Sequence, residues 1–300
     1  MTDSRRRDLD GAAPIRVALP NKGRLAERAL ELFEQAGLKP AFSGERALVA
    51  ALGDEFQAIF VRAADIPEYV ADGAAEVGVT GADLVAESGR DVREVLDLGF
   101  GRCRLAVAVR DDSPVRTATG LPAGTRVATS FPRVARAHFD ALDIPIVIAP
   151  VSGAAEIAPH LGIADVIVDL VSTGSTLRVN GLREVETILL STARLIAGPS
   201  ASADARARAS VEGLSTALES VVRAQAKRYL MANVPRDRLA EVRKVIPGLS
   251  GPTIVEVLDS GNWVAAHAVV DVDRVYQTIG RLKELGAEGI LVTRIERLMP

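Results

Sequence analysis

The stretch from residue 164 to residue 177 constrains this chain most, because it joins a buried strand to a turn of small side chains. It reads Ala-Asp-Val-Ile-Val-Asp-Leu-Val-Ser-Thr-Gly-Ser-Thr-Leu. The short β-branched run at 166–168 predicts a buried strand that ends in Asp169. A segment compatible with a helix follows from Leu177. A strand, a turn and a helix in this order are typical of α/β proteins.

The turn after this strand has the composition of an anion-binding cradle, with Ser172, Thr173, Gly174, Ser175 and Thr176 in succession. Glycine lets the backbone approach a ligand closely, while amide N–H groups at a helix N-terminus and nearby hydroxyls donate to an anion. The carboxylate of Asp169 cannot face an anion, but it can accept hydrogen bonds from sugar hydroxyls. A phosphosugar would suit both groups. Ordinary loops have the same composition, and the Walker A spacing with its lysine is absent.

Length, charge and composition exclude several kinds of protein. The 300 residues suffice for two or three domains, and a net charge of −3 gives no indication of a nucleic acid or membrane partner. The single Cys103 excludes an intramolecular disulfide and favours a reducing, cytoplasmic location. The histidines lack the spacing of a metal site, so no metal held by the protein is expected. No apolar run reaches the roughly 20 residues of a membrane helix.

Several polar side chains follow predicted strands in the first part of the chain. Lys22 and Arg24 follow a strand at 15–19, Arg62 follows one at 56–61, Asp83 follows one at 76–80, and a glycine-rich loop at 99–103 that ends in Cys103 follows one at 92–98. Ligands of open α/β sheets bind beyond the carboxyl ends of strands, so these groups are expected at one edge. Taken alone, each has an ordinary structural alternative, such as a solvated cationic loop for Lys22 and Arg24.

Turn-rich segments at 111–114 and 120–124 indicate a passage into a second lobe. There a helix is expected at 154–161, with Glu156 near its start. Glu156 is either a second carboxylate in a ligand-binding crevice between the lobes or an ordinary acid at a helix N-terminus. A long β-branched segment at 184–197 predicts a strand that returns to the first lobe, before a long helix at 203–227. We therefore expect a disordered tail at 1–13, a lobe I at 14–110 and 184–227, and a lobe II at 111–183.

Residues 228–300 have a different order of elements. Strands are expected at 229–234, 253–258, 263–270 and 289–294, helices at 235–245 and 271–285, and a turn at 259–262. The order βαββαβ is that of a ferredoxin-like, or ACT-like, α+β module. The segment contains no apparent nucleophile, general base or metal cluster, so it is expected to bind a ligand or to support assembly.

Several segments match a known family. They are Arg-Val-Ala-Leu-Pro-Asn-Lys-Gly-Arg-Leu at 16–25, Asp-Ile-Pro-Glu-Tyr-Val at 65–70, Gly-Val-Thr-Gly-Ala-Asp-Leu-Val at 78–85, and above all 156–180 with the core Asp-Leu-Val-Ser-Thr-Gly-Ser-Thr-Leu. The chain resembles the long form of ATP phosphoribosyltransferase from residue 16 onward. Pro-Gly-Leu-Ser-Gly-Pro-Thr-Ile at 247–254 and Gly-Ala-Glu-Gly-Ile-Leu-Val at 286–292 resemble the regulatory domain of that form.

The resemblance implies the first reaction of histidine biosynthesis. N1 of ATP attacks C1 of 5-phosphoribosyl 1-pyrophosphate, and the products are N1-(5-phosphoribosyl)-ATP and pyrophosphate. It also implies Mg²⁺ carried by the pyrophosphate of the substrate, feedback inhibition by histidine at the third domain, and homodimers that assemble into homohexamers. The expected fold is a two-lobed α/β catalytic region like that of periplasmic binding proteins, followed by the ferredoxin-like domain.

The resemblance and the residues together give an expected site. The catalytic residues are Asp169, Glu156, Lys22 and Arg62, and the substrate-binding residues are Arg24, Asp83, Cys103, Ser172, Thr173, Gly174, Ser175, Thr176 and Leu177. The resemblance points to Asn233, Leu249, Thr253 and Gly289 for the histidine pocket. No residue is expected to hold a metal.

Two alternatives remain at this point. A non-catalytic, two-lobed small-molecule binding protein would have the same lobes, although a signal peptide is missing and the cradle sequence argues against it. A catalytically silent regulatory paralogue would use only the C-terminal module, which the retention of Lys22, Arg62, Glu156 and Asp169 disfavours.

Overall fold

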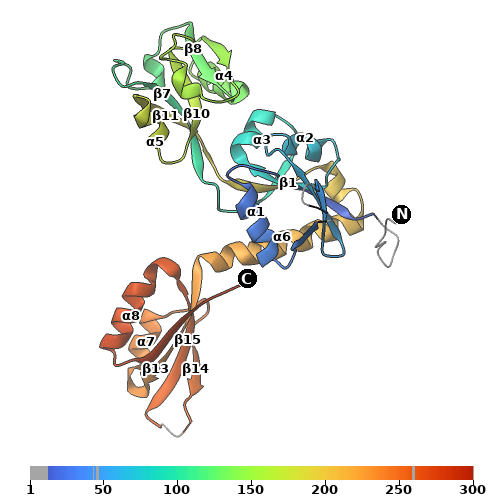
Figure 1. Cartoon of the computed structure of the whole chain (residues 1–300). Helices are drawn as coiled ribbons and strands as arrows, with labels where there is room; N and C mark the ends of the chain where they lie inside the picture. Colours follow the sequence, from blue (N-terminus) through green and yellow to red (C-terminus); the bar gives the residue numbers. More distant parts are fainter. Residues whose placement is uncertain (1–12, 43, 45–46, 259–260, 300) are drawn as a thin grey trace. The chain divides into compact units, whose positions relative to one another are not determined.

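The computed structural model describes residues 13–42, 44, 47–258 and 261–299 (Figure 1). The expected disordered tail, apart from residue 13, and the first half of the expected turn at 259–262 lie outside the described residues. The chain forms two compact units that divide between Ser215 and Thr216. No helix in the described part of the chain is both long and apolar enough to cross a membrane.

The first unit contains a sheet of seven strands in the order β2-β3-β4-β1-β5-β12-β6. Its elements are β1 (Ile15–Pro20), α1 (Ala26–Gln35), β2 (Pro40–Phe42), β3 (Val49–Leu52), β4 (Phe56–Val61), α2 (Ile66–Ala71), β5 (Val77–Gly81), α3 (Ala82–Ser88), β6 (Arg93–Asp97) and β12 (Ala193–Ala197). Strands β4 and β5 both pair in parallel with β1. The carboxyl ends of these three strands therefore share one edge of the sheet.

Helix α1 illustrates how the sequence forms this layer. Its buried side chains are Ala29, Leu32 and Phe33, which recur at the three- and four-residue spacing of one helix face. Gly37 follows with a φ of +82°, a left-handed conformation that glycine adopts without strain, and there the chain turns away from the helix. Strand β2 was not predicted from the sequence because its three residues give too short a pattern to be recognised.

The first unit also contains a sheet of five strands in the order β11-β7-β10-β8-β9. Its elements are β7 (Cys103–Arg110), β8 (Thr125–Thr129), α4 (Pro132–Ala141), β9 (Ile146–Pro150), β10 (Val166–Val171), α5 (Ser175–Val179) and β11 (Leu182–Ser191), with 3₁₀ turns at Ala118–Gly120 and Ala155–Ile157. Strands β10, β8 and β9 are parallel neighbours, so they too present their carboxyl ends at one edge.

Two local expectations for the second sheet were wrong. Strand β10 does not end at Asp169 but continues to Val171, because antiparallel pairing with β7 extends along Asp169, Leu170 and Val171. The segment 154–161 is not an α-helix. It forms a 3₁₀ turn and further turns, since Pro159 has no N–H to donate to an i−4 carbonyl and its neighbours bond to residues three positions back.

The chain passes between the two sheets at 98–102 and again at Thr192. The second passage divides the single strand expected at 184–197 into β11 and β12, which lie in different sheets. Strands β7 and β11 pair along their whole length within the second sheet. The boundaries read from the sequence placed residues up to 110 and from 184 in lobe I, whereas β7 and β11 belong to the second sheet. The pairing of these distant segments leaves no local signal in the sequence.

The C-terminal unit is built on a sheet of four strands in the order β14-β15-β13-β16. After the 3₁₀ turn Pro199–Ser202, the long helix α6 (Ala205–Gln225) leads to β13 (Lys227–Pro235), α7 (Leu239–Val245), β14 (Thr253–Glu256), β15 (Trp263–Asp271), α8 (Val275–Glu284) and β16 (Glu288–Arg294), with 3₁₀ turns at Arg236–Arg238 and Val272–Arg274. Figure 1 shows α7 and α8 on the same face of this sheet. The alternating buried residues of β13 and β15 form the core beneath them.

The predicted fold class is confirmed. The first unit has two α/β sheets joined by two crossing segments, and the second has the βαββαβ order and sheet topology of the ferredoxin-like module.

Candidate active site

The carboxyl edge of the first sheet gathers four of the residues singled out from the sequence. Pro20 pairs with Val61 at the ends of β1 and β4, and the N–H of Asn21 donates to the carbonyl of Val61 at 2.8 Å. Lys22 and Arg24 follow β1, Arg62 follows β4, and Asp83 follows β5. Lys22 and Arg62 are exposed, and within the described part of the chain neither forms an ion pair. Both positive charges are therefore free to meet an anion.

Arg24 and Asp83 form an ion pair at this edge. Nη2 of Arg24 lies 3.1 Å from each carboxylate oxygen of Asp83, and Nη1 of Arg24 donates to the carbonyl of Gly101. The Asp83 side chain is fully buried, whereas a third of the Arg24 side chain is exposed. The guanidinium group is therefore the member of the pair that a ligand can reach.

Cys103 lies beside this pair, at the start of β7, and is buried. Burial raises the pKa of its thiol, the charge of Arg24 opposes that shift, and the charge of Asp83 adds to it. The structure thus brings together Arg24, Asp83 and Cys103, which the sequence places 20 or more residues apart.

The turn after β10 has the expected strand–turn–helix geometry. Gly174 has a φ of +73° and precedes the short helix α5. The hydroxyls of Thr173 and Ser175 lie 2.9 Å apart. Ser172, Thr173, Ser175 and Thr176 are exposed, whereas Gly174 and Leu177 are buried and anchor the turn. Amide and hydroxyl groups at 172–176 can therefore be approached from solvent.

Asp169 lies just before this turn, on β10. Burial raises the pKa of its carboxyl group above the usual value, the N–H of Leu170 opposes that shift through a hydrogen bond of 2.7 Å, and the negative charge of Glu156 raises the pKa further. Glu156, which follows β9, is therefore close to Asp169. Ala154 has a φ of +52°, a strained conformation for a residue with a Cβ, and it starts the turn that carries Glu156.

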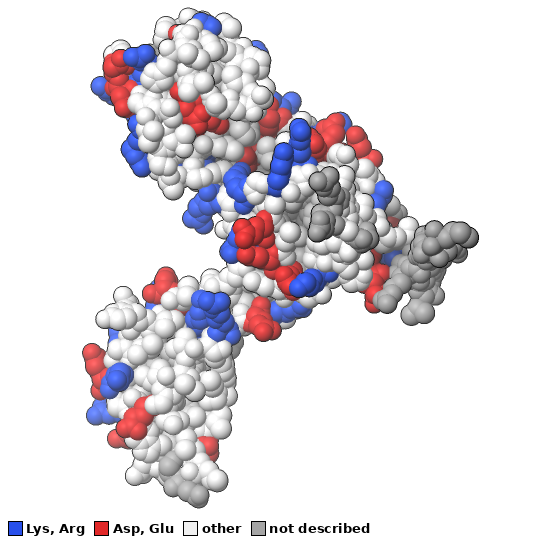
Figure 2. Space-filling model, viewed as in Figure 1, with Lys and Arg blue, Asp and Glu red and all other residues white. Residues whose placement is uncertain are grey.

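This arrangement suits the binding of a phosphorylated sugar and a second anion. The described residues contain no group of three or more His, Cys, Asp or Glu side chains that could hold a metal ion. Figure 2 shows acidic and basic side chains interspersed on the visible face.

Comparisons with known proteins decide between the possible functions. A family model described as "HisG: ATP phosphoribosyltransferase" matches residues 62–220, and one described as "HisG, C-terminal domain" matches residues 224–297. The chain belongs to the ATP phosphoribosyltransferase family. It is 61% identical to an ATP phosphoribosyltransferase of Gemmatimonas aurantiaca and 46% identical to one of Methanosarcina acetivorans. Each alignment covers 95% of this chain and the whole relative.

A solved structure agrees with this family. The chain is similar to an "ATP phosphoribosyl transferase (HisG:HisZ) complex from Thermotoga maritima", with a TM-score of 0.61 and 26% identity, over 71% of this chain and 99% of that one. The predicted family, enzyme class and function are confirmed: the protein is a transferase of the first step of histidine biosynthesis. The alternatives of a non-catalytic binding protein and a silent paralogue are set aside.

Three charged residues beside the 172–177 turn were not found from the sequence. Arg104 pairs with Glu184 through two hydrogen bonds, and its Nη1 donates to the carbonyl of Ser172 at 3.2 Å. Arg178, on α5, donates to the carbonyl of Thr173 at 3.4 Å. Arg178 falls within the segment that matches this transferase family and could have been noticed there. Arg104 and Glu184 reach the turn only through the pairing of β7 with β10 and β11.

Glu87 was also missed. Its two carboxylate oxygens accept hydrogen bonds from the N–H groups of Arg133 and Val134, at 2.9 and 3.0 Å, at the N-terminus of α4. An acid at a helix N-terminus satisfies donors that have no partner within the helix. Glu87 therefore connects α3 of the first sheet to α4 of the second sheet. No sequence pattern indicates that these two helices meet.

The four residues expected in the histidine pocket form two groups in one chain. Asn233 on β13 and Gly289 on β16 are neighbours, since a Cβ built on Gly289 would lie 3.4 Å from the side-chain nitrogen of Asn233. Leu249 and Thr253 lie at or beside the loop before β14, where Arg243, Pro247, Ser250, Gly251 and Pro252 line a cavity of about 340 Å³. Strands β14 and β16 are the opposite edges of the sheet.

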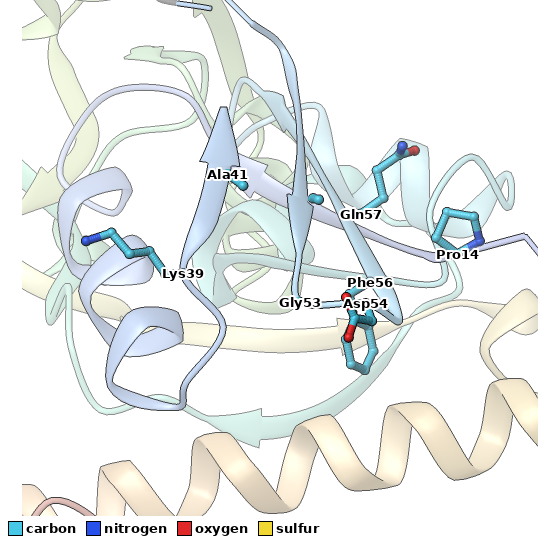
Figure 3. Close-up of a pocket in the computed structure, with 8 residues that line it drawn as sticks. Pro14, Lys39, Ala41, Gly53, Asp54, Phe56 and Gln57 are labelled. Atoms are coloured by element: carbon cyan, nitrogen blue, oxygen red, sulfur yellow. The ribbon is translucent and has the colours of Figure 1, made fainter. Parts of the chain in front are cut away.

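A second cavity, of about 590 Å³, lies at the other end of the first sheet (Figure 3). Pro14, which precedes β1, and the turn of Gly53 and Asp54, which precedes β4, contribute to its lining. These are the amino ends of the strands, away from Arg62 and Lys22. Ligands of such sheets bind at the carboxyl ends, so this cavity is not the candidate active site.

Proposed function

We propose that 5-phosphoribosyl 1-pyrophosphate binds with its 5′-phosphate on the amides and hydroxyls of the turn from Ser172 to Leu177. The observation that carries this proposal is the left-handed Gly174 before α5, with exposed hydroxyls on both sides. Backbone N–H groups at such a turn can donate hydrogen bonds to a phosphate, so the turn can bind an anion without a charged side chain. Arg178, which donates to the carbonyl of Thr173, adds positive charge beside the turn, whereas the charge of Arg104 is paired with that of Glu184.

Asp169 and Glu156 hold the ribose hydroxyls in this proposal. The mutual repulsion of the two carboxylates favours donors between them, and ribose hydroxyls are such donors. Lys22, Arg62 and the exposed guanidinium of Arg24 bind the phosphates of pyrophosphate and ATP from the edge of the first sheet. Cys103 and Asp83 lie on the nucleotide side.

The reaction requires no covalent nucleophile. Positive charge develops on the ribose ring as pyrophosphate leaves, and N1 of adenine attacks with its own lone pair. Placing the two substrates in line and neutralising the leaving group supply most of the acceleration. Asp169 and Glu156 stabilise the ring charge, and the cations at the edge of the first sheet stabilise the leaving pyrophosphate.

We also propose that Mg²⁺ enters with the pyrophosphate of the substrate. Its hard oxygen ligands would come from pyrophosphate and water. The carboxylates of Asp169 and Glu156 are possible metal ligands near the expected pyrophosphate position. They are only two, and the described residues contain no group of three or more His, Cys, Asp or Glu side chains that could hold the ion by themselves. The ion would neutralise charge on the leaving group.

The part of the C-terminal unit from residue 228 onward is proposed to bind histidine and to inhibit the reaction. Asn233, Leu249, Thr253 and Gly289 are its expected contacts. Asn233 on β13 and Thr253 at the start of β14 are separated by one strand, β15, at about 4.8 Å per strand. We propose homodimers that assemble into homohexamers, as the resemblance to the family implies. A cytoplasmic location fits a biosynthetic enzyme with one buried cysteine.

The test is release of pyrophosphate from ATP and 5-phosphoribosyl 1-pyrophosphate by the purified protein and by Asp169→Asn. This variant keeps the shape of the side chain but loses its charge, so we expect kcat to fall more than tenfold. The exposed Asp140 of α4 supplies a control, and Asp140→Asn is expected to keep the normal rate. A normal rate for Asp169→Asn would contradict the proposed role of this carboxylate.

A further inference from the structure

Ser191 ends β11, just before the chain crosses from the second sheet to the first. It is 1% exposed, and it contacts the fully buried Asp83 of the first sheet's edge. The Ser191 hydroxyl donates to Oδ1 of Asp83, and the N–H of Asp83 donates to Oγ of Ser191 at 3.1 Å. The first of these bonds restrains the rotation of the Asp83 carboxylate, and the second holds the Ser191 hydroxyl in place.

Asp83 in turn orients Arg24. Both carboxylate oxygens accept from Nη2 of Arg24, and the carbonyl of Gly101 accepts from Nη1. The carboxylate folds back so closely over Gly81 that a Cβ there would lie 2.1 Å from Oδ1. Asp83 has no exposed surface with which to touch a substrate. Its effect on a ligand must therefore pass through the guanidinium group that it holds.

We propose that Ser191 is a positioning residue for the transferase reaction, acting through Asp83 to hold Arg24 at the substrate edge of the first sheet. Without the hydroxyl, the carboxylate loses a donor in a buried position and can rotate away from Arg24. Ser191 also lies beside Cys103, its Cα partner on β7. Arg24 is therefore linked to both segments that cross between the sheets, directly to Gly101 in the first and through Asp83 to Ser191 beside the second. This inference rests on the proposed role of Arg24 in binding phosphates.

Two variants of equal shape test the hydroxyl. Threonine at this position keeps the hydroxyl, whereas valine has nearly the same volume and lacks it. We expect Ser191→Thr to retain kcat/KM within about twofold and Ser191→Val to lose about tenfold. Ser220 is another serine that is 1% exposed, on α6, and Ser220→Ala is the control for loss of a buried hydroxyl, with normal kcat/KM. Equal losses for Ser191→Thr and Ser191→Val would overturn the proposal.

A double-mutant cycle with Arg24→Gln separates positioning from a general structural effect. Arg24→Gln alone is expected to lower kcat/KM, and in its background Ser191→Val should change kcat/KM by less than about twofold. A full tenfold loss in that background would overturn the inference, because Ser191 would then act independently of Arg24. Normal kcat/KM for Arg24→Gln would overturn both the role of Arg24 and the inference. A normal rate for Asp169→Asn, with the cycle as expected, would refute only the proposed sugar site.

Discussion

Replacing Gly174 by alanine tests the proposed phosphate cradle most directly. The residue has a φ of +73°, and an L-residue in that region costs about 1–2 kcal/mol. An added Cβ would lie 3.3 Å from Nη1 of Arg178 and 3.4 Å from Oε1 of Glu184. Both contacts are with ends of flexible side chains that can move by a few tenths of an ångström. The backbone conformation, and not steric overlap, therefore sets the cost.

The strain has a specific consequence for binding. The chain can lower the cost by turning Gly174→Ala out of the left-handed region, which moves the following amides of Ser175 and Thr176. A hydrogen bond to a charged group contributes about 1.5–3 kcal/mol, and about 1.4 kcal/mol corresponds to a factor of ten. We therefore expect the KM for 5-phosphoribosyl 1-pyrophosphate to rise about tenfold or more, with the KM for ATP nearly unchanged. Initial rates with each substrate varied in turn measure both constants.

Gly124 provides the matched control. It has a φ of +83° in the turn before β8, and a Cβ there would meet nothing within 4 Å. Gly124→Ala should thus show the same backbone cost, seen as a Tm lower by about 2–8 °C, without a change in either KM. If Gly174→Ala lowers the Tm equally but leaves the KM for the phosphosugar unchanged, the turn does not hold the phosphate.

Two further predictions concern Asp169 and the C-terminal unit. The native state raises the pKa of Asp169 above its usual 3.8, so it holds the proton to higher pH than the unfolded chain does. Stability therefore falls as the pH rises through the interval above 3.8. Asp169→Asn should need more urea to unfold than the natural protein at pH 7, with the difference shrinking towards pH 3.8. An equal or lower urea midpoint at pH 7 would refute this account. A chain that ends at residue 227 is expected to release pyrophosphate without inhibition by added histidine, whereas retained inhibition would place the effector site elsewhere.

Local sequence patterns determined most of the elements of this fold. The parallel strands around Val17 and Val168 were readable because they are apolar, β-branched and bounded by turn residues. The turn at 172–177 was also readable, since glycine and small hydroxyl side chains occur there in immediate succession. Residues within one turn need no distant partner to be recognised together. The same holds for Lys22 and Arg62, which lie within three residues of the ends of predicted strands.

The tertiary structure alone decided which distant residues meet. Ser191 ends β11 with no local sign of function, and it contacts Asp83, more than 100 residues away, only because the chain crosses between two sheets there. Arg104 and Glu184 reach the cradle through strand pairing, and Glu87 reaches the start of α4 through packing of α3 beside it. Such contacts depend on sheet order and register. A sequence specifies these through the sum of many packing interactions, so no single segment displays them.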